Sequence, residues 1–432
     1  MKKAVLSNRI YLNFEEELYE KIKEELTYKI PSKVPGDPPL IKRTYNIIGN
    51  KFISFPIGRQ DLIPKNYEIV DKRAVVPAAF PDFKFTLREE QQKIYDAVND
   101  NCLINANTSW GKTFMAIAIA TKLKQKTLVI THTVNLRDQW SKEIKKTLGI
   151  KAGVIGSGQF SFAKYPIVVA NVQTVRKHVQ RLKNEFGLVV LDEVHHTPAT
   201  IFSSTIDGLS AKYKIGLSAT LKRKDFLHIL IPDYFSNKVY IPKEENQMTP
   251  EVYMFQTSIP FSSNNMIPWA NRVNELVARP EYLDLVTSIS EGFADKGHCV
   301  LTVSDRTEFI FKCAEVSGDR AVAIDGPTKD KDSLHKMFMN YEKDILYGAI
   351  SLYKEGISIN TLSCLVLAAP TNNEPLLDQL KGRITRKYSN KLTPVIVDIV
   401  LKGATAKKQS ATRAGYYIRK GWKITHVDLT QK

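Results

Sequence analysis

From residue 84 onward, short apolar runs recur along the chain, separated by stretches long enough for a crossover connection. A first series comprises 102–106, 127–131, 167–170, 188–192 and 213–218. Runs of this kind are typical of strands buried on both faces of a parallel sheet. The amphipathic stretch 87–98 and the apolar stretch 112–123 predict helices beside the first of these strands. We therefore expect an α/β fold.

A second series follows the proline-containing segment 231–250. It comprises 298–304, 345–351, 363–369 and 393–400. Two sets of parallel strands predict two successive sheet domains, which we place at 81–232 and 233–432. The lengths agree with a chain of 432 residues, for which about three domains are expected.

The first 80 residues have a different pattern. A charged segment carries apolar residues at 14, 18, 19 and 22, the spacing of a helix. Four prolines between 31 and 39 then interrupt any helix, and 44–49, 51–58 and 67–70 resemble short strands. We expect a small mixed α+β accessory domain over 1–80, joined to the rest by a proline-bearing linker at 75–83.

The formal net charge is +17, more than solubility requires. Such a surplus attracts nucleic acid, an anionic membrane surface or an acidic protein. No apolar run approaches the ~18 residues that span a bilayer, and the apolar stretch near the N-terminus ends before a signal sequence would be complete. Four widely spaced cysteines without a CxxC pair favour a reducing compartment. We expect a cytoplasmic protein.

The stretch 105–113, NANTSWGKT, lies between a predicted strand and a predicted helix, as a phosphate-binding loop does. Here Lys112 would neutralise the β and γ phosphates and the Thr113 hydroxyl would hold Mg²⁺. Ala106 replaces the first glycine of the GxxxxGK[ST] pattern, and Trp110 occupies a position where small residues are usual. The alternative is an ordinary turn. The loop residues expected to contact nucleotide are Thr108, Ser109, Trp110, Gly111, Lys112 and Thr113.

Two carboxylates, Asp192 and Glu193, directly follow an apolar strand. Asp192 at such a strand end would bind Mg²⁺ through water, and Glu193 would orient and deprotonate the water that attacks the γ-phosphate. A solvated loop is the competing interpretation, and it fits poorly after a buried strand.

With these motifs the chain resembles the superfamily 2 helicases of the DEAD/DEAH-like group, with DEVH at 192–195. Further segments match the motifs of that family in order. They are 87–92 for the adenine-reading element, 133–140 for motif Ia, 169–175 for Ib, 217–220 for III, 301–310 for IV, 351–359 for V and 379–386 for VI. The resemblance implies two tandem RecA-like domains.

The resemblance also implies roles for individual residues. Gln91 would read adenine, Gly356 would lie near the nucleotide, and Arg383 and Arg386 would stabilise the transferring phosphoryl group. The residues expected to contact the nucleic-acid backbone are Thr133, Arg137, Gln173, Thr174, Ser304, Arg306 and Ser351. Those expected to couple ATP hydrolysis to strand movement are His195, Ser218, Thr220 and Gln379.

Within this superfamily the chain is most similar to the phage-type UvsW and RecG-like branch-migrating DNA helicases. In those helicases an added N-terminal domain contacts duplex DNA at the junction, so the resemblance implies that the accessory domain over 1–80 binds nucleic acid. The implied activity is an ATP- and Mg²⁺-dependent DNA helicase acting on forks and Holliday junctions in replication, recombination or repair, with other proteins of those processes as further partners. An RNA helicase is one alternative. The other is a nucleic-acid-binding protein whose ATP site is blocked by Trp110.

Three smaller features of the sequence concern metal binding and basic segments. His195 and His196 lack the spacing of a zinc site, so no zinc is expected. Residues 401–432 are strongly basic but carry enough apolar side chains to predict a helix, a glycine stop at Gly421 and a closing strand at 422–427. The basic run 221–224 is either a solvated helix start or a nucleic-acid contact.

Overall fold

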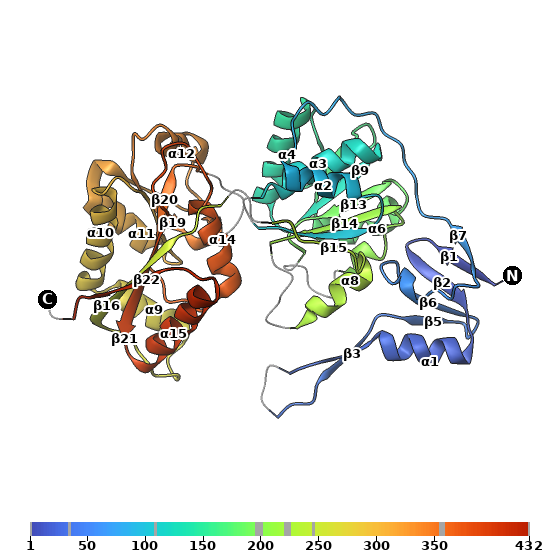
Figure 1. Ribbon diagram of the computed structural model, residues 1–432, viewed down its shortest axis with the longest axis horizontal. Coiled ribbons are helices and arrows are strands. Elements are labelled where there is room, and N and C mark those ends of the chain that lie inside the picture. The colour runs from blue at the N-terminus through green and yellow to red at the C-terminus, as the bar shows by residue number, and fades with distance from the viewer. Residues whose placement is uncertain are drawn as a thin grey trace. The chain divides into compact units, whose positions relative to one another are not determined.

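The apolar runs of the first series form a mostly parallel eight-stranded sheet, ordered β11-β10-β12-β9-β13-β14-β8-β15. The structure is a computed structural model that describes residues 2–32, 36–107, 110–194, 202–219, 226–243, 247–353 and 359–430. It divides into two units, 1–243 and 244–432 (Figure 1). The strands of this sheet are β8 (Cys102–Asn105), β9 (Thr127–Thr131), β10 (Gly153–Gly156), β11 (Gln159–Ser161), β12 (Ile167–Asn171), β13 (Leu188–Leu191), β14 (Tyr213–Ser218) and β15 (Val239–Tyr240).

Both faces of this sheet are buried. In β9, Leu128 and Ile130 belong to one apolar cluster, whereas Val129 belongs to another. This alternation requires helices on both sides. They are α2 (Glu89–Ala97), α3 (Lys112–Leu123), α4 (Val134–Leu148), α5 (Val172–Lys177), α6 (Val179–Leu182) and α8 (Ile231–Tyr234), with short turns η3 (Phe202–Ile206) and η4 (Leu227–Leu230).

The second unit contains a seven-stranded sheet, ordered β18-β19-β17-β20-β21-β16-β22, in which every pairing is parallel. Its strands are β16 (Glu251–Pro260), β17 (Cys299–Ser304), β18 (Ala321–Ile324), β19 (Ile345–Ala349), β20 (Leu362–Leu367), β21 (Val395–Lys402) and β22 (Ile424–Asp428). Its helices are α9 (Trp269–Val277), α10 (Pro280–Ala294), α11 (Thr307–Ser317), η5 (Gly318–Arg320), α12 (Lys331–Met339), α13 (Ile350–Tyr353), α14 (Glu374–Ile384) and α15 (Ala404–Arg419). The predicted closing helix and strand are thus confirmed as α15 and β22.

The N-terminal part has its own five-stranded sheet and apolar core. Its elements are β1 (Lys3–Leu6), β2 (Arg9–Asn13), α1 (Glu16–Glu25), β3 (Thr27–Ile30), β4 (Leu40–Arg43), β5 (Asn46–Ile48), β6 (Phe52–Pro56), η1 (Gln60–Leu62) and β7 (Glu68–Asp71). Strands β3 and β4 form a separate two-stranded ribbon. The predicted mixed α+β character is confirmed.

The N-terminal part is docked on the first sheet domain through buried polar groups. The Arg9 guanidinium pairs with the Asp207 carboxylate, and the Asn8 amide donates to the Asp207 carbonyl at 2.7 Å. A second contact surrounds Asp233, which accepts hydrogen bonds from the hydroxyls of Tyr28 at 2.9 Å and Thr44 at 2.8 Å. Because these groups are buried and paired, separating the two parts would expose them at a considerable energetic cost.

The first unit extends to Lys243, beyond the boundary expected after residue 232. The reason is β15, which continues the sheet by pairing with β8. The predicted linker 75–83 contains no helix or strand, but its backbone is bonded to the sheet domain, as in the bond from the Ala78 amide to the Lys124 carbonyl at 3.0 Å. Among the residues that the structure describes, no helix is long and apolar enough to cross a membrane.

Buried Lys214, next to the docked interface, makes the free energy of unfolding depend on pH. It is fully buried in β14, its ammonium donates to the Ile206 carbonyl at 2.8 Å, and burial lowers its pKa from 10.5 to about 8 against the opposing effect of Asp207. Between these pH values the unfolded chain binds a proton that the folded protein does not, so the free energy of unfolding rises with pH. The Lys214→Met protein lacks this group. We therefore expect the free energy of unfolding of wild type, relative to that of Lys214→Met, to rise by up to about 3 kcal/mol from pH 8 to 10.5.

Chemical denaturation at a series of pH values measures this difference. A difference that stays constant between pH 8 and 10.5 would show that Lys214 does not titrate as its burial requires.

Candidate functional site

The phosphate-binding loop predicted from the sequence leads from β8 into α3. Gly111 is the N-terminal cap of α3 and has a φ of 95°. A Cβ atom there would lie 3.0 Å from the Gln91 amide nitrogen. The backbone conformation therefore favours glycine, and a side chain here would also crowd the Gln91 amide.

Trp110 faces the core. Its side chain is 5% exposed and belongs to the apolar cluster that contains Ile104, Ala106 and Met115. Its carbonyl accepts a hydrogen bond from the Gln91 amide at 2.9 Å and another from the Arg88 guanidinium. The bulky residue and the alanine of the unusual loop thus pack within the apolar core of the domain.

Lys112 connects the loop to the acidic strand end. Its ammonium donates to the Ala106 carbonyl at 2.9 Å and lies 3.8 Å from the Glu193 carboxylate. The connection follows from the topology, since β8 and β13 are separated only by β14 and all three run parallel. Their carboxyl ends therefore meet at one edge of the sheet. Thr113, the next residue of α3, is half-buried.

Asp192 is held at the end of β13 by two donors. Its carboxylate accepts hydrogen bonds from the backbone amide of Glu193 at 2.9 Å and from the indole N–H of Trp140 at 2.7 Å. Burial, followed by the charge of Glu193, raises the pKa of Asp192 to about 6, whereas the Trp140 bond opposes this rise. Glu193 adopts a φ of 49°, uncommon for a non-glycine residue, which turns the chain sharply where the strand ends.

Trp140 was not among the predicted site residues. It lies on α4 and is 1% exposed. A buried tryptophan usually finds a partner for its N–H, and this was the available signal, but the sequence did not identify the partner.

Replacing Trp140 with phenylalanine keeps most of the ring and removes the donor to Asp192. Because a hydrogen bond to a charged group contributes about 1.5–3 kcal/mol, we expect ATP turnover to fall about tenfold, with a higher Mg²⁺ requirement. Steady-state ATPase assays over a Mg²⁺ series measure both effects. Trp269→Phe on α9 is the control, and equal turnover in the two variants would contradict the role of Trp140.

The residues predicted to contact nucleic acid in the first unit lie at two helix starts. Thr133 caps α4, and its hydroxyl accepts a hydrogen bond from the Leu136 amide at 3.3 Å. At the start of α5, Gln173 is exposed and Thr174 is half-buried. Arg137 is 6% exposed, and its guanidinium donates to Asn171 at 3.0 Å, just before α5. Arg137 therefore holds the two helix starts together.

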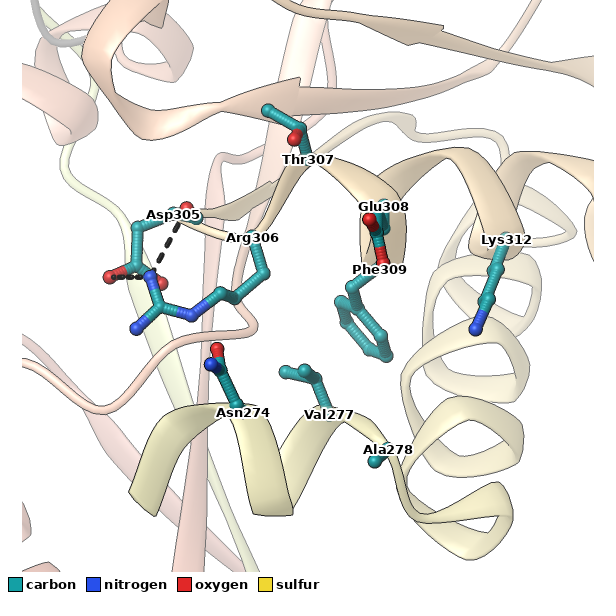
Figure 2. A pocket seen from close by; sticks show the side chains of 9 residues that line it. All are labelled: Asn274, Val277, Ala278, Asp305, Arg306, Thr307, Glu308, Phe309 and Lys312. Atoms are coloured by element: carbon teal, nitrogen blue, oxygen red, sulfur yellow. Dashed lines mark hydrogen bonds and ion pairs between the residues drawn. The ribbon is translucent and has the colours of Figure 1, made fainter. Parts of the chain in front are cut away.

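In the second unit, Ser304 ends β17 and is fully buried, its hydroxyl accepting the Arg306 amide at 3.2 Å. Arg306 lines a pocket of about 440 Å³ between α9 and the start of α11, together with Asn274 and Lys312 (Figure 2). It pairs with Asp305 at 3.1 Å. Ser351 is exposed on α13.

The predicted motif VI residues lie on or just after α14. Gln379 and Arg383 are buried, and the Arg383 guanidinium donates to the Tyr353 carbonyl at 2.9 Å. Arg386 approaches the Asn360 side chain at 3.5 Å. In the first unit Ser218 is buried at the end of β14. The predicted residues Thr108, Ser109, His195, Thr220 and Gly356 lie outside the described residues.

Comparison with known proteins agrees with this arrangement. Residues 84–223 match the family model described as type III restriction enzyme, res subunit. Along almost the whole chain, the protein is 39% identical to probable helicase D10 of Escherichia phage T5, covering 98% of this chain and 95% of that protein. The chain belongs to the superfamily 2 helicases. Enzymes of this family are nucleic-acid-dependent ATPases, so the helicase uses ATP and binds nucleic acid.

Other relatives differ in the nucleic acid that their names carry. A protein of Acanthamoeba polyphaga mimivirus, named as an ATP-dependent RNA helicase, is 28% identical over 96% of the helicase and 85% of its own length. The DNA 3'-5' translocase XPB2 of Sulfurisphaera tokodaii is 31% identical over 42% of each chain.

One solved structure supports the fold. S. cerevisiae Dbp5, bound to RNA and ADP BeF3, matches with a TM-score of 0.55 and 15% identity, over 79% of the helicase and 89% of that chain. T4 UvsW matches over all of both chains with a TM-score of 0.44 and 16% identity. The two tandem RecA-like domains expected from the sequence are confirmed.

Proposed function

We propose that this helicase is an ATP-driven DNA motor that unwinds or branch-migrates forked and Holliday-junction-like DNA in replication, recombination or repair. The observation that carries its ATPase part is the convergence of Lys112, Asp192 and Glu193 at one edge of the first sheet. The preference for DNA over RNA is supported by the similarity to the DNA translocase.

In the proposed reaction, Lys112 neutralises charge on the β and γ phosphates. It now donates to the Ala106 carbonyl, so nucleotide binding would exchange that neutral acceptor for a phosphate oxygen. Glu193, 3.8 Å from the lysine, orients the attacking water and accepts its proton. Gln91 holds the loop through a hydrogen bond to the Trp110 carbonyl. Its contact with adenine stays a prediction from the sequence resemblance.

The site fits Mg²⁺ through its oxygen donors. The Thr113 hydroxyl and the Asp192 carboxylate are hard ligands of the kind this ion prefers, and Asp192 keeps lone pairs for a bridging water beyond its two hydrogen bonds. A bound ion would supply positive charge to the β and γ phosphates. The phosphoryl-transfer roles of Arg383 and Arg386 remain predictions from the sequence.

Stimulation of ATP turnover by different nucleic acids tests the proposal. The purified helicase is mixed with equal nucleotide concentrations of forked DNA, plain duplex DNA, single-stranded DNA and tailed RNA duplex. We expect forked DNA to give the greatest stimulation. Greater stimulation by tailed RNA would overturn the DNA assignment and favour an RNA helicase.

A further inference from the structure

The net positive charge of the N-terminal part is concentrated in one segment, because that segment has few acidic residues. Residues 26–60 contain six lysines and arginines but one acidic residue, Asp37. The rest of the first 80 residues carries eight basic and nine acidic side chains. The small net positive charge of the first 80 residues is therefore the sum of a basic segment, 26–60, and a remainder with a slight acidic excess, here called the acidic remainder. That segment contains the ribbon formed by β3 and β4.

The strand register gives the ribbon two distinct faces. Lys29 pairs with Ile41, and Thr27 pairs with Arg43. Residues directly opposite in an antiparallel pair point to the same side, so Lys29, Ile41 and Arg43 share one face. All three are exposed, and Ile41 leaves 45% of its surface open to solvent. The opposite face carries Tyr28 and Lys42.

The opposite face explains how the ribbon stays folded. An isolated two-stranded hairpin is marginally stable in water. Here Tyr28 packs against an apolar cluster of the first RecA-like domain and donates its hydroxyl to Asp233, and Ile30 is buried. Thr44, the residue after β4, bonds the same carboxylate. The ribbon is thus fixed at its base and projects from the rest of the N-terminal part (Figure 1).

The charges on the exposed face are available. Within the described part of the chain, neither Lys29 nor Arg43 makes an ion pair, whereas Lys2 and Lys3 pair with Glu15 and Glu68. Ile41 leaves apolar surface exposed beside these two cations. The same combination suits a ligand with a phosphate backbone and apolar base edges.

We propose that the outward face of the β3–β4 ribbon, carrying Lys29, Ile41 and Arg43, binds the groove of B-form duplex DNA next to the branch point. The major groove of B-form DNA admits a two-stranded ribbon, and its thymine methyl groups offer an apolar contact to Ile41. The major groove of an A-form RNA duplex is too deep and narrow for side chains. The inference rests on the proposed function and assigns its duplex-binding element.

The double variant Lys29→Ala/Arg43→Ala tests the inference. Its matched control is Lys21→Ala/Lys65→Ala, which removes two exposed lysines from the acidic remainder. Affinity for a blunt DNA duplex is measured by fluorescence anisotropy over a salt series. We expect the ribbon variant to bind about tenfold more weakly near physiological salt, with a salt slope smaller by about 1.8, because two phosphate contacts are lost. The control should bind like wild type.

Two further measurements separate the possible failures. ATP turnover stimulated by single-stranded DNA should be unchanged in the ribbon variant, since neither residue is near the phosphate-binding loop in sequence. If wild type shows no DNA-stimulated turnover, the proposed function fails. If wild type is stimulated but the ribbon variant binds duplex DNA as tightly as the control, the ribbon inference alone fails. An equal loss of affinity for an RNA duplex would contradict the fit to a B-form groove.

Discussion

Replacing Glu193 with glutamine is expected to slow ATP turnover by about a hundredfold to a thousandfold while leaving ATP binding almost unchanged. The amide keeps the size of the side chain but cannot accept a proton from the attacking water, and general-base catalysis contributes about 10²–10⁴. Glu193 also faces the Lys112 ammonium at 3.8 Å, so the variant loses one negative charge near the γ-phosphate. ATP affinity should therefore be equal or slightly higher.

Single-turnover hydrolysis and binding of a fluorescent ATP analogue measure the two effects separately. Glu185→Gln is a suitable control, because Glu185 is a half-exposed carboxylate of the same domain outside the site. A Glu193→Gln protein that hydrolyses ATP at the rate of this control would assign the catalytic base to another residue.

The Lys112→Ala variant should lose both ATP affinity and turnover, with turnover falling by at least about a hundredfold, the usual loss when one charge-stabilising donor is removed. Lys112 is buried and bonded to the Ala106 carbonyl, so its removal also leaves that acceptor without its donor. Loss of affinity distinguishes this variant from Glu193→Gln.

The same two assays apply, with Lys145→Ala on α4 as a control for removal of an exposed lysine. Thermal unfolding checks that the Lys112→Ala protein remains folded. Retained ATP affinity in a folded Lys112→Ala protein would contradict the proposed contact with the phosphates.

The central strands of the two sheets could be predicted because short, continuously apolar runs are typical of strands buried on both faces. Residues 213–218 form β14 with the predicted limits, and the stretch 112–123 forms α3. A strand buried on both faces must be continuously apolar, and this pattern is visible without any knowledge of contacts. The candidate catalytic residues at the strand ends were predicted for the same reason, since parallel topology gathers those ends.

Elements with exposed faces were harder to predict. The ribbon of β3 and β4 contains polar and apolar residues in nearly equal share, and β15 has only two residues. Their pairing partners lie far along the chain or outside any repeating pattern. Tertiary contacts therefore decide whether such segments become strands.

Side-chain orientation within the site was also beyond the sequence. Trp110, predicted to contact nucleotide, packs its side chain in the core, and Arg137, predicted to contact nucleic acid, is buried and bonded to Asn171. Each motif specifies the residue type and its place in the loop. The residues that pack against each side chain lie on other helices and strands, and only the three-dimensional structure identifies them.

Branch migration of a synthetic four-way DNA junction tests the proposed function most directly. The purified helicase is incubated with a labelled mobile junction, with ATP and Mg²⁺, beside an RNA duplex of matched length with a single-stranded tail. The account predicts that wild type converts the junction into duplex products in an ATP-dependent manner, that Lys112→Ala does not, and that the RNA duplex is unwound far more slowly. Unwinding of the RNA duplex with no conversion of the junction would contradict it.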